Sequence, residues 1–247
     1  MSHDLVCRGV NVRFGQFHAL RDINVSFQPN RVTALIGPNG AGKTTLMNVL
    51  SGLQKHSGQV LLGDQDISGL RPDRRAGLGI SRSFQIVAVF PDMTVFENMR
   101  LALQPNALAW SMPWRSIHGY RDLAADAAAR LETFGLHDVA DRPAAELSHG
   151  QQKLLELALS LASDPKVLLL DEPLAGVGHG DAKTFVQTLG RISEGRTTVL
   201  VEHNMDVVLN VADHIIVLAD GSLFAQGTPA EIRADRKVRD VFLGQSA

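Results

Sequence analysis

The alternation of apolar and polar residues predicts an antiparallel sheet near the start of the chain. Apolar side chains occupy every second position in two nearby stretches. These positions are Val10, Val12 and Phe14 in the first stretch and Ile23, Val25 and Phe27 in the second. A two-residue period is typical of strands with one buried face, so we expect a small half-buried sheet here.

Later in the chain, short apolar runs alternate with helical patterns. We expect strands at 32–36, 59–62, 80–84, 167–170 and 197–201, and a hairpin of 215–218 and 223–226 around Asp220-Gly221. Continuous apolar runs suit strands of a parallel sheet that helices cover on both faces. The predicted fold class is therefore α/β, with a mainly parallel sheet and a separate N-terminal antiparallel β subdomain.

Several predicted helices carry capping signals. In a capping box, Ser or Thr bonds the backbone N–H three residues on, and Glu or Gln at that position bonds back. The pairs are Thr94 with Glu97, Ser148 with Gln151, and Thr228 with Glu231. Helical spacing of apolar residues predicts two more helices. One covers 120–134 and ends at Gly135, and its apolar face consists of Leu123, Ala127, Leu131 and Phe134. The other is marked by Phe185, Leu189 and Ile192.

We expect a single domain over 1–247 with a helical insert at about 86–142. Within the insert, 104–119 holds both tryptophans, Trp110 and Trp114, and two prolines, which predicts a loop or a broken helix. Its apolar residues form either a partner surface or a satellite core. The apolar residues that follow Gln85 form either a docking surface for a partner or part of the insert's own core; they are Ile86, Val87, Val89 and Phe90.

The composition argues against several classes of protein. The 247 residues are 45% hydrophobic with a net charge of −2, so no basic field for nucleic acid is expected. The single cysteine, Cys7, excludes an internal disulfide and a cysteine-based zinc cluster. No apolar run reaches the roughly 18 residues that span a bilayer, and the first residues lack the pattern of a secretory signal. We therefore expect a cytoplasmic protein.

The stretch between the strand at 32–36 and the next helix predicts a nucleotide phosphate site. It fits G-x-x-x-x-G-K-[ST], in which backbone N–H groups contact phosphate oxygens, the lysine adds positive charge and the hydroxyl reaches Mg²⁺. The residues are Gly37, Pro38, Asn39, Gly40, Ala41, Gly42, Lys43, Thr44 and Thr45. The helix that follows has one apolar face, formed by Leu46, Val49, Leu50 and Leu53. Its N-terminus should therefore point at the phosphates.

Two other predicted strands end in residues suited to nucleotide hydrolysis. Asp171 and Glu172 follow one strand, and His203 follows another. Ligands of parallel sheets bind beyond the carboxyl ends of the strands, where these residues and the phosphate loop should meet. Asp171 can hold Mg²⁺ together with Thr44, Glu172 can polarise the attacking water, and His203 can orient that water or sense the terminal phosphate.

Phe14, which precedes Gly15, lies at the end of a predicted strand. Its ring suits stacking on a purine base, and it equally suits a place in the core. The spacing of residues does not separate these two alternatives.

Together these motifs resemble the ATP-binding cassette family, the cytoplasmic ATPases of ABC transporters, along nearly the whole chain. The matches are 37–45 to the Walker A loop, 167–172 to Walker B, 147–151 to the signature, Gln85 to the Q-loop, His203 to the switch histidine and Phe14 to the adenine-stacking aromatic. The resemblance implies an ATPase that uses ATP and Mg²⁺.

The resemblance also implies that two cassettes, identical or from two genes, sandwich two ATP molecules. Ser148, Gly150 and Gln151 would then contact the nucleotide held by the other subunit, with their helix N-terminus facing the terminal phosphate. The implied metal residues are Thr44, Gln85 and Asp171, and the implied catalytic residues are Glu172, His203 and Gln85.

Two positions depart from the family pattern. His149 replaces a common glycine in the signature, which a contact made by serine and backbone should tolerate. Gly178 replaces the usual aspartate in the loop after Walker B, and this leaves the communication between the two sites of the dimer open.

Within the family, 81–85, 90–98 and 241–244 resemble ATPase subunits of branched-chain amino-acid importers. Such subunits bind membrane permeases, work indirectly with a solute-binding protein and lie on the cytoplasmic face of the inner membrane. The alternatives are an ATPase of a urea or short-amide importer, one of lipopolysaccharide export, and a soluble assembly factor. A scaffold that never hydrolyses ATP is disfavoured because Lys43, Asp171, Glu172 and His203 are all present.

Overall fold

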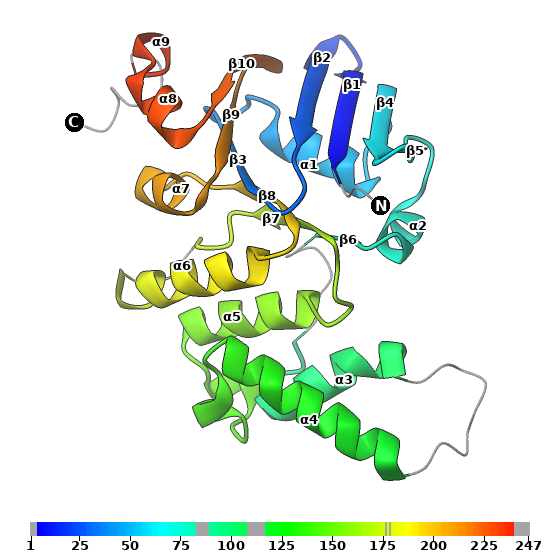
Figure 1. The fold of residues 1–247 in the computed structure, drawn as a ribbon, viewed down its shortest axis with the longest axis vertical. Helices are drawn as coiled ribbons and strands as arrows, with labels where there is room; N and C mark the ends of the chain where they lie inside the picture. Colours follow the sequence, from blue (N-terminus) through cyan, green and yellow to red (C-terminus); the bar gives the residue numbers. More distant parts are fainter. Residues whose placement is uncertain (1–3, 83–88, 108–116, 176, 178, 240–247) are drawn as a thin grey trace. The chain divides into compact units, whose positions relative to one another are not determined.

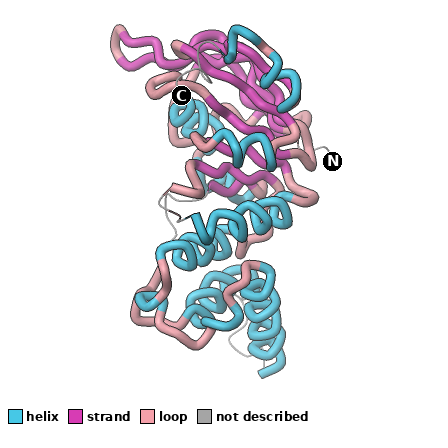
Figure 2. Tube along the Cα trace, turned by 90° about the vertical axis from the view of Figure 1, so that its left-hand side faces the viewer, coloured by secondary structure: helices cyan, strands magenta, loops and turns pink. Residues whose placement is uncertain are grey.

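The structure is a computed structural model that describes residues 4–82, 89–107, 117–175, 177 and 179–239. The chain forms two compact units. Unit 1 comprises Met1–Arg82, Lys166–Pro173 and Leu189–Ala247, and unit 2 comprises Ser83–Pro165 and Leu174–Thr188. Unit 1 contains both sheets (Figure 1), whereas the described part of unit 2 is built from helices and loops (Figure 2).

The first sheet of unit 1 is the predicted N-terminal antiparallel sheet. Its strands are β1 (Leu5–Phe14), β2 (Phe17–Phe27), β4 (Ser57–Leu62) and β5 (Gln65–Asp66), in the order β2-β1-β4-β5. All neighbouring strands in it are antiparallel. The alternating pattern therefore predicted β1 and β2; β4 was expected from a later apolar run, and no pattern predicted β5.

The second sheet is mainly parallel, as predicted. Its strands are β3 (Val32–Ile36), β6 (Ile80–Arg82), β7 (Val167–Asp171), β8 (Thr197–Val201), β9 (His214–Ala219) and β10 (Ser222–Gly227), in the order β10-β9-β3-β8-β7-β6. Only β10 is antiparallel to its neighbour, because it forms the predicted hairpin with β9. Its turn uses Asp220 and Gly221, which both have positive φ.

Helices cover both faces of this sheet. On one face, α1 (Lys43–Ser51) joins residues of the first sheet and Leu35 of β3 in the main core. On the other face, Ala34 and Ile36 pack with residues of α7 (Met205–Val211), α8 (Pro229–Ala234) and α9 (Arg236–Val238). Adjacent side chains of β3 thus point to opposite faces, and both faces are buried.

The predicted apolar face of α1 is correct except at its last residue. Leu46, Val49 and Leu50 are fully buried, but Leu53 is 51% exposed. The helix ends at Ser51, because the C-cap Gly52 adopts a left-handed conformation with φ 81°. Leu53 therefore lies beyond the helix and off its apolar face, and the prediction for this residue was wrong.

A buried arginine closes the C-terminal end of α1. Arg75, on the short helix α2 (Pro72–Gly77), is only 1% exposed. Its guanidinium donates to the carbonyl oxygens of Val49 at 2.7 Å, Leu50 at 2.8 Å and Ile67 at 2.8 Å. The bonds to Val49 and Leu50 satisfy carbonyls at the end of α1 that have no partner within the helix.

Unit 2 contains the predicted helices α3 (Val95–Ala107), α4 (Ile117–Thr133) and α5 (His149–Ser160), and two short 3₁₀ helices (His137–Val139 and Ala144–Glu146). The apolar face predicted for α4 is buried from Leu123 to Phe134. All three capping boxes are confirmed: in the box of α3, Thr94 N–H donates to Glu97 Oε2 at 2.9 Å, and Glu97 N–H donates back to Thr94 Oγ1 at 3.1 Å. The helix predicted around Phe185 is α6 (His179–Ser193).

Some predictions concern positions outside the described residues. Gln85, Ile86, Val87, Trp110, Trp114 and Gly178 belong to this group. Across the described part of the chain, no helix combines the length and apolar character that crossing a membrane requires.

Candidate nucleotide-binding site

The phosphate loop connects the end of β3 to the start of α1. Gly42 takes φ 100°, and a Cβ atom there would lie 2.7 Å from Leu20 Cδ2 and 2.8 Å from the carbonyl oxygen of Ala19. Gly37 is equally confined, because its Cβ would lie 2.2 Å from the carbonyl oxygen of Leu218. The loop thus needs glycine at both positions to pass between β2 and β9.

Most of the remaining loop is accessible to a ligand. Pro38, Asn39 and Gly40 are exposed, while Ala41 is buried. Thr44 and Thr45 follow in the first turn of α1, with Thr44 exposed and Thr45 half-buried.

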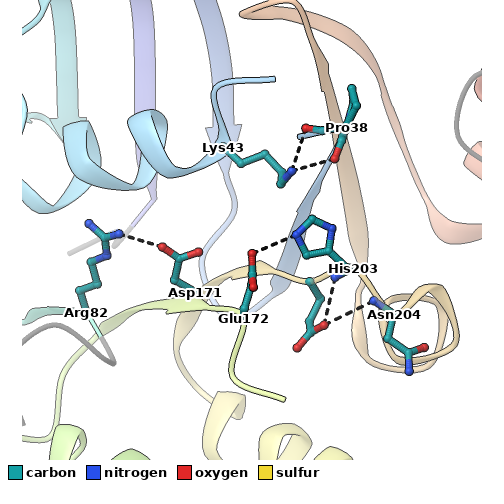
Figure 3. A network of polar contacts seen from close by, with 9 residues as sticks. Pro38, Lys43, Arg82, Asp171, Glu172, His203 and Asn204 are labelled. Atoms are coloured by element: carbon teal, nitrogen blue, oxygen red, sulfur yellow. Dashed lines mark hydrogen bonds and ion pairs between the residues drawn. The ribbon is translucent and has the colours of Figure 1, made fainter. Parts of the chain in front are cut away.

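The Lys43 side chain folds back onto the backbone of the phosphate loop. Its side chain is largely buried, and its Nζ donates to the carbonyl oxygens of Gly37 at 2.7 Å and Pro38 at 3.0 Å (Figure 3). Burial lowers the pKa of Lys43, and the nearby carboxylates of Glu172 and Asp171 oppose this shift. The ammonium is thus held at the loop, where a phosphate could replace the carbonyl oxygens as its partner.

Asp171 is the last residue of β7, and its carboxylate pairs with an arginine that the sequence reasoning missed. Arg82 Nη2 donates to Asp171 Oδ2 at 2.8 Å, and the Arg82 side chain is only 6% exposed. Arg82 ends β6, which is the neighbour of β7. A basic residue inside the predicted strand 80–84 was the available signal, although neither the end of this strand at Arg82 nor the order of the strands was known from sequence.

Glu172 and His203 contact each other directly. His203 Nε2 and Glu172 Oε1 are 2.9 Å apart, and about half of each side chain is exposed. Glu172 has a positive φ of 48°, and its backbone N–H donates to the carbonyl oxygen of Val201 at 2.9 Å. The neighbouring carboxylate of Glu202 accepts the backbone N–H of His203 at 3.0 Å. The bonds of Glu172 with Val201 and with His203 connect the end of β7 to the end of β8.

The strand order explains why these groups meet. The neighbours in the sheet are β3, β8 and β7, and all three are parallel. Their carboxyl ends therefore share one edge, which carries the phosphate loop, His203, and the pair Asp171 and Glu172 (Figure 3). The sequence predicted this grouping from three separate strands.

Phe14 is not a core residue. Its ring is 52% exposed at the end of β1, and its register partner across the hairpin is Phe17, which is 61% exposed. The hairpin strand β2 contacts the phosphate loop through Ala19 and Leu20, as the confinement of Gly42 shows. Exposure excludes the core alternative for Phe14, and stacking on a base stays a prediction.

The signature residues lie in unit 2, at the N-terminus of α5. Ser148 Oγ accepts the backbone N–H of Gln151 at 3.2 Å, and the Gln151 side chain accepts the N–H of Ser148 at 3.0 Å. Gly150 is buried, whereas the His149 side chain is exposed. His149 thus leaves the first turn of this helix undisturbed.

Comparisons with known proteins show the family of this chain. The profile of the family described as ABC transporter matches residues 20–175, and the profile described as branched-chain amino acid ATP-binding cassette transporter matches 222–247. The high-affinity branched-chain amino acid transport ATP-binding protein LivG of Escherichia coli K12 is 36% identical over 250 residues, which cover 98% of both chains. Its counterpart BraF of Pseudomonas aeruginosa is 36% identical over 247 residues, or 96% of both chains.

Solved structures show the same fold. The crystal structure of the ADP conformation of an ATP-binding cassette of an ABC transporter superposes with a TM-score of 0.82 at 32% identity, covering 99% of both chains. A nucleotide-free cassette gives a TM-score of 0.81 at 32% identity over 98% of this chain and 99% of that one. Since the family profile spans more than half of the chain and full-length relatives share over a third of its residues, this protein belongs to the ABC transporter family, as one of its ATP-binding cassettes.

Proposed function

We propose that this cassette hydrolyses MgATP to energise an importer of branched-chain amino acids. The observation that carries the ATPase part is the meeting of the phosphate loop, Asp171, Glu172 and His203 at one edge of the sheet. The transported substrate rests on LivG and BraF, which are named for branched-chain amino acid transport, and on the second profile match at 222–247.

Hydrolysis requires that charge on the phosphates is neutralised and that water is aligned for attack. Lys43 would leave the carbonyl oxygens of its loop and bind the β- and γ-phosphates, together with backbone N–H groups of 37–45. Glu172 would polarise the attacking water. His203, which lies 2.9 Å from Glu172, would hold that carboxylate in place and sense the terminal phosphate.

The residues at the site fit Mg²⁺. Thr44 and Asp171 supply a hydroxyl and a carboxylate, the hard oxygen ligands that Mg²⁺ prefers, and we add Gln85 from the family resemblance. The described residues contain no cluster of three or more His, Cys, Asp or Glu that would hold a metal alone, which suits an ion that is bound largely through nucleotide phosphates. The metal would neutralise charge on the phosphates.

The remaining contacts involve the base and a second subunit. We propose that Phe14 stacks on adenine, which its exposure permits. Ser148, Gly150 and Gln151 would face the nucleotide of a partner cassette, since the N-terminus of α5 favours an anion. We treat 1–247 as one ATPase domain with a helical insert at about 86–142.

The partners follow from importer function. We propose that two such subunits, identical or different, dock on membrane permeases at the cytoplasmic face of the inner membrane, and that a solute-binding protein delivers the substrate. The absence of a membrane-spanning helix from the described residues is compatible with peripheral attachment.

Deletion of the gene in the organism that carries it tests the transport function. We expect lower uptake of labelled leucine, isoleucine and valine, unchanged uptake of urea, and recovery with the wild-type gene but not with Lys43→Ala. A tagged protein should also purify from detergent extracts together with a permease. Loss of urea uptake instead, or a tagged protein that has no membrane partner, would contradict the proposal and favour a urea importer or a soluble assembly factor.

A further inference from the structure

Arg82 joins the elements that carry the proposed metal ligands. It ends β6, and its guanidinium is almost fully buried. Nη2 donates to Asp171 Oδ2 at 2.8 Å, while Nη1 donates to Asn48 Oδ1 and, at 3.4 Å, to Ser51 Oγ (Figure 3 shows the bond to Asp171). Asn48 and Ser51 belong to α1. The guanidinium therefore bridges the helix after the phosphate loop and the strand β7.

The Arg82 guanidinium contacts α1 one helical turn after Thr44. Asn48 follows Thr44 by four residues in α1, so the two lie on the same helix face. On the other side of the guanidinium is Asp171, the second proposed ligand. Arg82 thus contacts both described elements that carry a proposed ligand, α1 with Thr44 and β7 with Asp171.

We propose that Arg82 is a positioning residue for the metal of the MgATP complex. By binding Asp171 Oδ2 and Asn48 Oδ1 it fixes the distance between β7 and α1, and it directs the other carboxylate oxygen of Asp171, Oδ1, to the metal. The inference rests on the proposed ATPase function, because only that function places Mg²⁺ between Thr44 and Asp171.

Two effects of Arg82 on the metal have opposite signs. Its positive charge repels Mg²⁺, so electrostatics alone would make metal binding tighter when the charge is removed. Its hydrogen bond orients a metal ligand, and loss of such a bond usually costs roughly ten- to hundred-fold in metal affinity. A planar guanidinium can also bind two partners at once, which an ammonium does less well. The direction of the change in a variant therefore separates positioning from simple repulsion.

The test compares nucleotide affinity with and without metal. The dissociation constant of a fluorescent, non-hydrolysable ATP analogue is measured in excess Mg²⁺ and in EDTA, and the ratio gives the gain that the metal provides. For Arg82→Gln we expect an unchanged constant in EDTA and a metal gain reduced roughly ten-fold. Arg82→Lys should recover part of the gain, because its ammonium can still donate to Asp171.

Matched variants separate this role from general effects. Arg71→Gln removes the same charge from a side chain that is 82% exposed, and it should leave both constants unchanged. Asn48→Ala removes only the helix anchor and should reduce the gain less than Arg82→Gln does. The double variant should cost less than the sum of the two, since both changes break one network. If Arg82→Gln does not fold, Arg82→Lys and Asn48→Ala make the same test.

Two results would overturn the inference: a metal gain that increases, or one that is unchanged, which includes an equal loss of affinity in EDTA and in Mg²⁺. Asp171→Asn distinguishes this failure from failure of the proposed function. If Asp171→Asn abolishes the metal gain and Arg82→Gln does not, only the role of Arg82 is wrong. If neither variant changes the gain, the proposed metal site is wrong as well.

Discussion

At the scale of single residues, the charged groups of the site are paired with other protein groups. Lys43 donates to loop carbonyl oxygens, Asp171 accepts from Arg82, and Glu172 lies against His203. Lys43 and the Arg82 side chain are buried, and a buried charge without a partner would cost roughly several kcal/mol, so their bonds offset the cost of burial. Glu172 and His203 are about half exposed, and water shares in solvating their pair. On binding, Lys43 would exchange its carbonyl partners for phosphate oxygens.

Cys7 allows a prediction about pH at the same scale. Burial raises the pKa of its thiol from 9.0 to about 12, while the charge of Arg75 lowers it to a smaller extent. The folded state therefore keeps the proton at a pH where the unfolded chain loses it. The stability that Cys7 contributes is fully present below pH 9 and is lost as the pH rises toward 12.

We expect the free energy of unfolding to fall more steeply above pH 9 in the wild type than in Cys7→Ala, by about 1 kcal/mol per pH unit. Urea unfolding of both proteins at pH 8, 9.5 and 10.5 measures the two slopes. Other titrating groups are common to both proteins and cancel in the comparison. Parallel slopes would show that the Cys7 thiol ionises as easily in the folded state as in the unfolded chain.

At the scale of elements, sequence patterns correctly predicted helix starts and turns, because these depend on interactions between residues close in the chain. The capping box at Ser148 and the turn at Gly221 involve residues close in sequence, and both formed as predicted. The end of α1 was missed because the apolar period continues to Leu53, whereas Gly52 ends the helix. The pairing of Arg82 with Asp171 was beyond reach, since it joins residues 89 positions apart whose strands become neighbours only in the folded sheet.

Arg75 was missed for the same reason, because no sequence pattern predicted that its side chain bonds the carbonyl oxygens at the C-terminal end of α1. Arg75→Ala should lower the free energy of unfolding by about 3 kcal/mol, since the carbonyl oxygen of Leu50 loses its donor, those of Val49 and Ile67 each lose one of two donors, and the packing of a buried side chain is removed. Arg74→Ala is the matched control on the same helix, because the Arg74 side chain is 79% exposed. Chemical denaturation of both variants makes the comparison. A similar small loss in both would mean that water replaces the Arg75 guanidinium.

At the scale of the whole molecule, a transport ATPase has to pass on the events at its nucleotide site to a permease. The described residues that follow the Q-loop position include Val89, which is half-buried, and Phe90, which is 46% exposed. Phe90 is also tied to α3, because Asn98 Nδ2 donates to its carbonyl oxygen at 3.0 Å. An exposed ring on a well-anchored backbone suits a partner surface better than it suits the core of unit 2.

We therefore predict that Phe90→Asp weakens attachment to the permease and uptake while ATP binding and folding are retained. Co-purification with the permease, nucleotide affinity and thermal unfolding measure the three properties. Phe224→Asp is the matched control, since Phe224 on β10 is 40% exposed and belongs to unit 1. Normal attachment of Phe90→Asp, or its failure to fold, would remove Phe90 from the docking surface.

The central claim is that Glu172 at the carboxyl end of β7 activates water for ATP hydrolysis. The most direct measurement is turnover and ATP affinity in Glu172→Gln, which keeps the shape of the side chain and removes its charge, with Glu194→Gln as an exposed control. We predict retained ATP binding, an accumulated nucleotide-bound dimer, and turnover lower by about 100-fold or more, against unchanged turnover in the control. Wild-type turnover in the Glu172→Gln protein would contradict the account.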